Sequence, residues 1–425
     1  MSGSGLGDTE EQVAGGGLLH RRMLLRGGVL AGGLGAAFAA RAADPIGAGS
    51  PDGMKVPGAA FSGYGTPAHW REGIKRTIGA LPDRPGTGAS RTPLERLEGS
   101  ITPAGLHFER HHNGIPDIDP AAHTLIVHGL VKQSLVFSLD ALMRYPMQSR
   151  IHFVECAGNS GGMIAPAAAQ NTAGGLHGLL SCSEWTGIPV SSLLDETGID
   201  PKATWLLAEG ADAAGMSRSV PLWKCMDDAM IALYQNGEPI RPEQGFPMRL
   251  LVPGFQGNMN VKWLRRLKLT AGPTYTKDET SKYTELMRDG KARQFQFGMG
   301  VKSVITKPSF GMTMSGQGLY EISGVAWSGA GRVARVEVSA DGGNSWAEAA
   351  LNGPVLPKAV TRFRAPWRWA GGPSLLLSRA TEETGDVQPV RADWLAQYAP
   401  GQNYHYNAIN AWQVEAGGSI KHVYA

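Results

Sequence analysis

The sequence predicts a two-domain α+β protein, with a mixed domain from about residue 100 to 290 followed by an antiparallel β-sandwich from about 300 to 425. The 425 residues exceed the roughly 100–200 residues of one typical domain. Glycine (58 residues) and proline (27 residues) are frequent, which favours short strands joined by turns. Near residue 300 the pattern changes from strands mixed with helices to strands alone.

The N-terminus predicts an export signal. Arg21 and Arg22 precede an apolar stretch over residues 23–40, and Ala40-Arg41-Ala42 offers a cleavage site. We expect residues 1–42 to be a twin-arginine leader and the mature protein to be periplasmic. That pathway exports folded proteins, often with a cofactor already inserted. The glycine-rich core of the leader is too weakly hydrophobic for a membrane span, and the net charge of +3 gives no case for nucleic-acid binding.

Residues 43–99 are rich in glycine, proline and short charged segments, and we expect an extended arm with little core of its own. The mixed domain then alternates strand-like and helix-like segments. Ser138 is a predicted N-cap, and Asn236-Gly237 predicts a hairpin turn. The strand-like runs are at residues 123–131, 231–240 and 247–270, and the helix-like runs are at residues 138–145 and 189–198.

The predicted sandwich, residues 300–425, consists of alternating strands at regular spacing. Asp341-Gly342-Gly343 is a hairpin signal between two of them. This part of the chain has no helix-period segment of useful length, which is typical of a β-sandwich. The strand patterns lie at residues 319–329, 332–351, 359–369 and 374–385.

Three cysteines limit the chemistry: Cys156, Cys182 and Cys225. An odd number cannot be fully paired within one chain, so at least one thiol is free or is a ligand. The sequence contains no C-x-x-C or C-x-x-C-H motif, so we expect no thioredoxin-type dithiol and no c-type haem attached to this chain. The His111-His112 pair has no cysteine at zinc-finger spacing. Cys182 and Cys225 are predicted to be buried structural residues, with a mutual disulfide as the alternative.

Cys156 begins the turn Cys-Ala-Gly-Asn-Ser-Gly-Gly at residues 156–162, directly after an apolar run. The glycines allow a bulky group to approach the backbone. The residue pattern leaves three interpretations open: a small buried hydrophobic residue, a nucleophile or a metal ligand.

Seven separated motifs, in this order, resemble the sulfite oxidase family of molybdenum enzymes. They are FERHHNGIPDIDP (108–120), ECAGNSGG (155–162), EWTGIPVSSLL (184–194), EGAD (209–212), SVPLWKCMD (219–227), NGEPIRPEQGFPMRLLVPG (236–254) and NVKWLRRL (260–267). The segment at 324–346 resembles the immunoglobulin-like dimerisation domain of that family. GLHGLLSCSEWTG (175–187) is similar to its sulfane dehydrogenase branch, from the Sox thiosulfate-oxidising system.

The resemblance implies one molybdenum–molybdopterin cofactor per chain and no haem in this chain. It implies that Cys156 donates its thiolate to molybdenum, a role that suits soft sulfur. Arg110 is expected close to the metal, where it would orient the substrate. The pterin and its phosphate need fixed donors. The family motifs place the cofactor contacts at Arg110, His112, Cys156, Asp212, Gln244, Arg249, Asn260, Val261 and Lys262.

The chain also departs from sulfite oxidases. Ser160 and Gly161 stand where those enzymes have basic residues, so a cationic clamp for free sulfite is lost. Met216 replaces a family tyrosine, and nearby Arg218 is predicted to be a catalytic substitute charge. Gln244 replaces a family histidine. An open pocket without the clamp suits a sulfur atom presented on a carrier better than free sulfite.

We therefore expect a sulfane dehydrogenase subunit that oxidises persulfide sulfur on a carrier protein to the sulfone level. Because no haem motif is present, electrons would pass to a c-type cytochrome subunit. The sandwich makes a homodimer or a dimer of heterodimers the expected assembly. The alternatives are a sulfite dehydrogenase of the same family and, from another class, a metal-free sulfur-carrier-binding protein.

Overall fold

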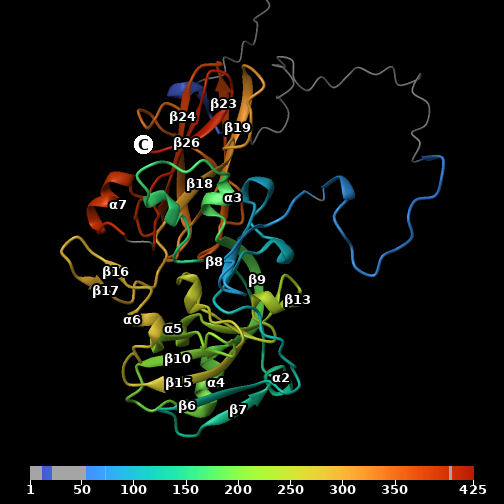
Figure 1. The fold of residues 1–425 in the computed structure, drawn as a ribbon, viewed down its shortest axis with the longest axis vertical. Coiled ribbons are helices and arrows are strands. Elements are labelled where there is room, and N and C mark those ends of the chain that lie inside the picture. The colour runs from blue at the N-terminus through green and yellow to red at the C-terminus, as the bar shows by residue number, and fades with distance from the viewer. Residues whose placement is uncertain (1–11, 22–53, 72, 402–403) are drawn as a thin grey trace, which may run out of the picture.

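The computed structural model describes residues 12–21, 54–71, 73–401 and 404–425, and these form two lobes stacked along the long axis (Figure 1). The lobe at the bottom of Figure 1 is mixed α and β, and the upper lobe is mainly β. The predicted α+β class is confirmed. No helix of the described residues is both long and apolar enough to cross a membrane.

Two five-stranded sheets form the mixed lobe. One has the order β11-β10-β15-β6-β7, with β15 and β6 parallel and the other neighbours antiparallel. Its strands are β6 (Thr124–Gly129), β7 (Leu135–Ser138), β10 (Trp205–Gly210), β11 (Ser217–Pro221) and β15 (Leu264–Thr270). The other has the order β13-β12-β9-β8, and β14 also pairs with β12. Its strands are β8 (Gln148–Glu155), β9 (Leu180–Pro189), β12 (Met230–Gln235), β13 (Glu238–Pro239) and β14 (Arg249–Leu251).

Short helices cover this lobe, and α4 shows why they form. Val190, Leu193 and Leu194 recur at helical spacing and are fully buried in the main core cluster of the lobe. Gly198, at φ 68°, ends the helix in a conformation that glycine adopts readily. The helices are α2 (Leu139–Leu142), α4 (Val190–Thr197), α5 (Leu222–Asp227) and α6 (Lys277–Thr280). Helix α3 (Ala173–His177) instead packs against the sandwich, where Ala173 joins the core cluster.

The predicted arm is only partly extended. Residues 54–70 are exposed, and Figure 1 shows this segment leaving the body of the protein. The prediction was wrong for the end of the arm, because β3 (Thr77–Ala80) and β4 (Gly88–Arg91) form a hairpin that pairs with β5 (Glu109–His111). Leu94, which follows β4, is buried. Strand pairing with β5 therefore orders a segment that has few apolar residues of its own.

The second lobe is a sandwich of two sheets around one core. One sheet has the order β1-β2-β23-β19-β18, with β22 pairing to β23, and the other has the order β21-β20-β24-β25-β26. Val325 and Phe363 from the first sheet and Val336 and Leu376 from the second share one buried cluster. The strands are β18 (Lys302–Lys307), β19 (Gly318–Trp327), β20 (Val333–Ser339), β21 (Ala347–Glu348), β22 (Ala350–Leu351), β23 (Thr361–Trp369), β24 (Ser374–Glu382), β25 (Ala411–Val414) and β26 (Ile420–Val423). Helix α7 (Arg391–Gln397) and the hairpin of β16 (Glu285–Leu286) and β17 (Ala292–Arg293) lie beside the sandwich (Figure 1).

Several local sequence signals fold as predicted. Ser138 caps α2 by accepting a hydrogen bond from the backbone N–H of Ala141. Asn236 and Gly237 both have positive φ and join β12 to β13, as a two-residue hairpin turn requires. The turn beginning at Asp341 joins β20 to β21.

The structure describes only part of the predicted leader. The apolar core and cleavage site at residues 22–42 lie outside the described residues. Residues 12–21 are described. Strand β2 (Leu18–Leu19) extends the sandwich by pairing with β23, and β1 (Gln12–Ala14) pairs with β2. Leu18 is fully buried there.

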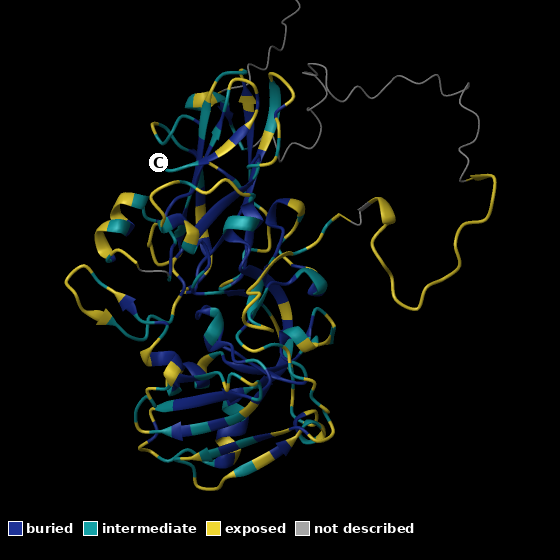
Figure 2. Ribbon diagram, viewed as in Figure 1, coloured by how far each residue is buried: buried dark blue, intermediate teal, exposed yellow. Residues whose placement is uncertain are grey.

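The lobes share a buried interface. Phe153 of β8 and Leu180 and Cys182 of β9 belong to the same apolar cluster as the sandwich core. The backbone N–H of Phe153 also donates to the carbonyl of Lys358 in the second lobe, at 3.0 Å. Figure 2 shows buried residues continuing from one lobe into the other. The end of β8, where Cys156 follows, is therefore held by both lobes.

Candidate cofactor site

A cavity of about 690 Å³ lies where β5, the end of β8 and the loops after β10 and β14 meet. The structure brings every predicted cofactor contact to the wall of this cavity. These residues are Arg110, His112, Cys156, Asp212, Gln244, Arg249, Asn260, Val261 and Lys262.

Backbone contacts fix the Cys156 turn in place. The N–H of Cys156 donates to the Leu179 carbonyl at 3.0 Å, and its carbonyl accepts from the N–H of Asn159 at 2.8 Å. The short helix η8 (Gly257–Met259) lies against this turn. A Cβ on Gly257 would stand 2.9 Å from the Glu155 carbonyl oxygen and 3.3 Å from the Cys156 Cα, so only glycine fits without movement.

Burial raises the pKa of the Cys156 thiol, while the Gly158 backbone N–H and the charge of Arg110 act in the opposite direction. The free thiol is therefore protonated at neutral pH. Coordination by a metal would displace that proton, because the thiolate is the ligand form of cysteine.

Arg249 and Lys262 are cations with little compensation. The Arg249 guanidinium is buried, donates to the carbonyls of Gln244 and Asn260 at 3.0 Å each, and has one unsatisfied N–H at Nε. Burial alone lowers the pKa of Arg249 to about 9. Burial, followed by the charge of Arg249, holds the pKa of Lys262 well below its usual range. An anion bound beside these groups would oppose both shifts by stabilising the charged forms.

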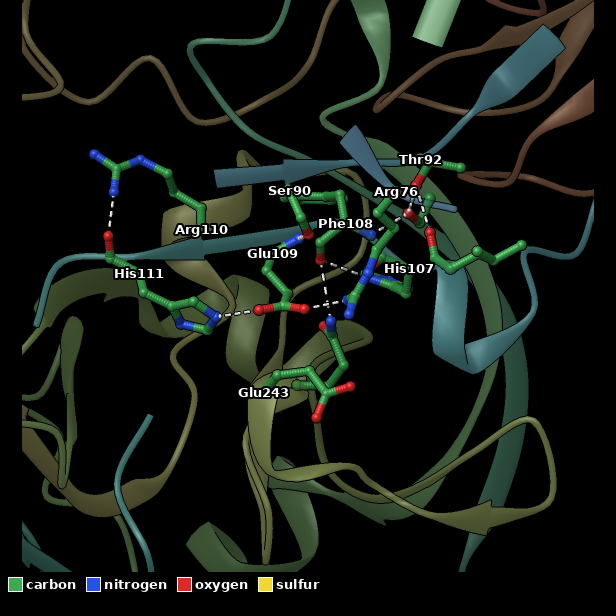
Figure 3. A network of polar contacts seen from close by, with 12 residues as sticks. Arg76, Ser90, Thr92, His107, Phe108, Glu109, Arg110, His111 and Glu243 are labelled. Atoms are coloured by element: carbon green, nitrogen blue, oxygen red, sulfur yellow. Dashed lines mark hydrogen bonds and ion pairs between the residues drawn. The ribbon is translucent and has the colours of Figure 1, made fainter. Parts of the chain in front are cut away.

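Strand β5 positions a polar network on one side and Arg110 on the other (Figure 3). His111 Nε2 lies 2.8 Å from Glu109 Oε2, and Glu109 also pairs with Arg76. Lys262 Nζ donates to His111 Nδ1 at 2.9 Å. Side chains alternate along a strand, so Arg110 projects to the opposite side from Glu109 and His111.

His112 follows β5 and is neutral in the cavity. Burial, followed by the charge of Arg110, lowers the pKa of His112 to about 4. Its Nε2 lies 3.3 Å from the Tyr283 hydroxyl. A neutral imidazole beside a phenol is a hydrogen-bonding pair that can orient a polar ligand.

Three predicted contacts also stabilise their own loops. Asp212 accepts a hydrogen bond from the Met216 N–H at 3.2 Å, and Gln244 Nε2 donates to the Phe108 carbonyl at 3.0 Å. Asn260 Oδ1 accepts from the Val252 N–H at 2.7 Å. These residues set the shape of the wall as well as lining it.

Arg218, predicted to be a catalytic charge, does not line this cavity among the described residues. It is buried, lies 3.7 Å from Glu279 and donates to Asn258. Its guanidinium stands 5.0 Å from the centre of the Tyr283 ring. Arg218 therefore reaches the cavity through Asn258 and Tyr283, and its charge is offset by Glu279.

Tyr283 and His107 also line the cavity, and neither was predicted from the sequence. Tyr283 lies outside the matched motifs, and only the folded chain brings it into the same cavity as Met216. His107 directly precedes the FERHH motif, which is a signal that could have identified it. Its Nε2 is buried without a hydrogen-bond partner, and burial lowers the pKa of His107 to about 3.

A second, open cavity of about 930 Å³ adjoins the first, and we call it the vestibule. Arg110, His112 and Met216 line both cavities. The vestibule adds the charged side chains of Arg84, Lys277, Lys282 and Asp278. The approach to the Cys156 cavity is therefore predominantly cationic.

The residues fit a molybdopterin cofactor. The unsatisfied Arg249 Nε and His107 Nε2 point to a bound polar group that would complete their hydrogen bonding. The pair of buried cations matches a phosphate, and Cys156 supplies a sulfur ligand at the cavity wall. Cys182 and Cys225 are free and buried, so the alternative of a disulfide between them was wrong.

Family models match both lobes. The oxidoreductase molybdopterin binding domain matches residues 112–277, and the Mo-co oxidoreductase dimerisation domain matches residues 293–411. The chain is 32% identical to mitochondrial sulfite oxidase of Mus musculus over 345 residues, which cover 75% of this chain and 62% of the relative. It is 33% identical to inducible nitrate reductase [NADH] 1 of Glycine max over 351 residues, which cover 71% of this chain and 39% of the relative. The chain thus spans less than two thirds of the length of these relatives.

The solved structure of the sulfane dehydrogenase SoxCD from Paracoccus pantotrophus is similar over almost the whole chain. The TM-score is 0.85 and the identity 42%, and the match covers 89% of this chain and 100% of that chain. The two domain models and this match over most of the chain agree. The chain belongs to the sulfite oxidase family of molybdopterin-binding oxidoreductases and resembles its sulfane dehydrogenases.

Proposed function

We propose that this protein is the molybdenum subunit of a periplasmic sulfane dehydrogenase, which oxidises persulfide sulfur on a carrier protein and passes the electrons to a c-type cytochrome subunit. The main observation is the junction of the two cavities: the Cys156 cavity opens past Arg110, His112 and Met216 into a wide, cationic vestibule. An open approach of this kind suits a sulfur atom carried on a protein segment. The similarity to SoxCD supports the same substrate class.

Cys156 and the cavity wall hold the cofactor in this proposal. The Cys156 thiolate would bind molybdenum, and Arg249 and Lys262 would bind the phosphate of the pterin. When bound, the molybdenum centre supplies oxygen-atom transfer to sulfur and accepts two electrons. The backbone contacts of the Cys156 turn fix the direction in which the thiolate points.

Arg110 and the Tyr283–His112 pair act on the substrate. Each turnover adds one oxygen atom from water to the sulfur and releases two protons and two electrons. The sulfur becomes more anionic as oxygen atoms are added, and Arg110 offers a positive charge where the two cavities meet. The Tyr283 hydroxyl, which lies beside His112 in the Cys156 cavity, donates or accepts a hydrogen bond. The electrons pass one at a time to the cytochrome. The sandwich lobe forms the contact between two copies of the chain in the dimer.

The test uses the purified protein together with its cytochrome subunit. Molybdenum is measured first, and haem reduction is then followed with free sulfite and, separately, with persulfide-loaded carrier protein. Reduction by the carrier at least tenfold faster in kcat/KM than by sulfite is the expected result. Reduction by free sulfite that is as fast as or faster than reduction by the carrier would overturn the proposal. Location is tested by fractionating cells that produce the full chain, with the double substitution Arg21→Lys and Arg22→Lys as the control.

A sulfite dehydrogenase is the second candidate. It is favoured by the identity to mitochondrial sulfite oxidase and by Arg110, whose guanidinium could bind a free anion. Against it, the turn after Cys156 carries Ser160 and Gly161 instead of cations. Equal or faster haem reduction by free sulfite is the result that would establish this candidate. Absence of bound molybdenum in the exported protein would instead support a metal-free carrier-binding protein.

A further inference from the structure

A cation lies beside the turn after Cys156, because Lys302 of β18 contacts this turn from the second lobe. Lys302 is buried, and its Nζ donates to the Ser160 hydroxyl at 2.6 Å and to the Tyr406 carbonyl at 2.8 Å. The same ammonium lies 3.5 Å from Glu155 Oε1. The contacts of Lys302 thus include residues on both sides of Cys156.

The Ser160 hydroxyl links this ammonium to the mixed lobe. An ammonium group only donates, so Ser160 Oγ accepts from Lys302. The Ser160 hydroxyl proton is then available to His177 Nδ1, which lies 2.6 Å from Ser160 Oγ. Ser160 has φ 63°, an uncommon conformation for a serine, and these two partners hold it there. His177 is buried, and its contact with Ser160 helps to hold the Cys156 turn in place.

Glu155, the residue before Cys156, depends on the second lobe as well. Its Oε2 accepts from the Trp327 indole N–H at 2.6 Å, and its Oε1 accepts from Asn159 at 2.9 Å. Without Lys302 a buried carboxylate would stand one residue from the metal ligand with no opposite charge. Such a charge is costly and tends to rearrange its surroundings.

We propose that Lys302 is the positioning residue of the Cys156 turn, and that it holds the turn from the sandwich lobe by pairing with Glu155 and donating to Ser160. Lys302 does not line the cavity among the described residues, so it acts through Glu155 and Ser160 and not on the substrate. The second lobe therefore completes the metal-ligand loop, in addition to its role in assembly. The inference rests on the proposed function only in taking Cys156 as the molybdenum ligand.

The test compares Lys302→Met with wild type in the molybdenum-loaded full chain. Two readouts are used: the rate of molybdenum release in mild denaturant and the Mo(V) EPR spectrum. We expect release to be at least tenfold faster and the EPR spectrum to change, because the thiolate loses its fixed direction. Lys302→Arg, which keeps the charge, should restore both readouts in part.

Lys224→Met is the matched control. Lys224 is another buried lysine, and it pairs with Asp228 at 2.6 Å on helix α5 and its C-terminal end instead of with Glu155 or Ser160. This control should lower the melting temperature while leaving the EPR spectrum and the release rate unchanged within twofold.

Two outcomes would overturn the proposal. One is a Lys302→Met protein that is destabilised like the Lys224→Met control but has wild-type release and a wild-type EPR spectrum. If Lys302→Met does not fold, Ser160→Ala tests the proposal instead, because it removes only the bridging hydroxyl. Wild-type molybdenum release and a wild-type EPR spectrum in Ser160→Ala would then contradict the proposal. Neither readout involves substrate, so a protein that holds molybdenum but ignores carrier persulfide would overturn the proposed function alone.

Discussion

Tyr283 is the clearest functional residue that only the folded chain reveals. It adopts φ 54°, which is a rare conformation for a bulky side chain and is most often retained at functional sites. Its hydroxyl lies 3.3 Å from His112, and it shares the cavity wall with Met216. Burial raises the pKa of Tyr283, so the phenol stays protonated at physiological pH. We infer that Tyr283 takes the place of the phenol that the family has at Met216.

Tyr283→Phe is expected to lower kcat/KM for the sulfur substrate by about 10-fold to 100-fold, the effect of losing one hydrogen bond or proton donor in a catalytic cavity. Molybdenum content and melting temperature should stay close to wild type, because the ring remains. Steady-state haem reduction measures the effect. Tyr145→Phe, which removes a hydroxyl bonded to Glu196 on the protein surface, is the control. Equal kcat/KM in the two variants would contradict the role of Tyr283.

At the scale of elements, the contact between η8 and the Cys156 turn decides the shape of the cavity floor. The hairpin and cap signals at Asn236-Gly237 and Ser138 could be predicted because each depends on neighbouring residues alone. The approach of Gly257 to Glu155 could not, since the two segments lie far apart in the chain.

Gly257→Ala is expected to destabilise the protein by about 1–3 kcal/mol, the cost of an added methyl group in a close-packed contact. It should also reduce molybdenum occupancy, because the Cys156 turn would have to move. Chemical unfolding and metal analysis measure the two effects. Gly272→Ala is the control, as a Cβ added there would have no atom within 4 Å. If the two substitutions have the same effect on stability and on molybdenum occupancy, the close contact of Gly257 with the Cys156 turn does not determine either property.

For the whole molecule, buried histidines should make the fold sensitive to acid. Burial lowers the pKa of His107 and His405 to about 3 and that of His152 to about 4, from about 6.5 in the unfolded chain. Below pH 6.5 the unfolded chain therefore binds protons that the folded chain excludes. The free energy of unfolding should fall as the pH falls from 6.5 towards 4, by up to about 1.4 kcal/mol per pH unit for each histidine.

Urea unfolding over this pH range measures the slope. His152→Gln should flatten the slope by up to about 1.4 kcal/mol per pH unit, the contribution of one such histidine. His152 is suited to this test because it lies away from the cavity, with its Nδ1 3.3 Å from the Lys358 carbonyl. An unchanged slope in His152→Gln would show that this histidine is protonated in the folded protein.

The vestibule should attract an anionic carrier through long-range electrostatics. Reversing charge with Lys277→Glu and Lys282→Glu is expected to lower kcat/KM for carrier-bound substrate by about tenfold at low ionic strength, and by less at high ionic strength. Stopped-flow haem reduction measures the rate. The control is Lys421→Glu, an exposed lysine on β26 of the sandwich. A similar effect of the control would mean that overall charge, and not the vestibule, attracts the carrier.

The amino-acid sequence was enough to predict the two-domain α+β organisation and the local turns and caps, because these follow from short-range patterns. It was also enough to predict the residues that line the cofactor cavity, because these residues lie within motifs that resemble those of the family. Cys156, Arg249 and Lys262 could be identified in this way. Folding was needed to show that the last part of the arm pairs with β5, that Arg218 is offset by Glu279, and that Tyr283 and Lys302 approach the Cys156 turn. Those contacts join residues far apart in the chain, and packing between elements, which no local pattern encodes, brings them together.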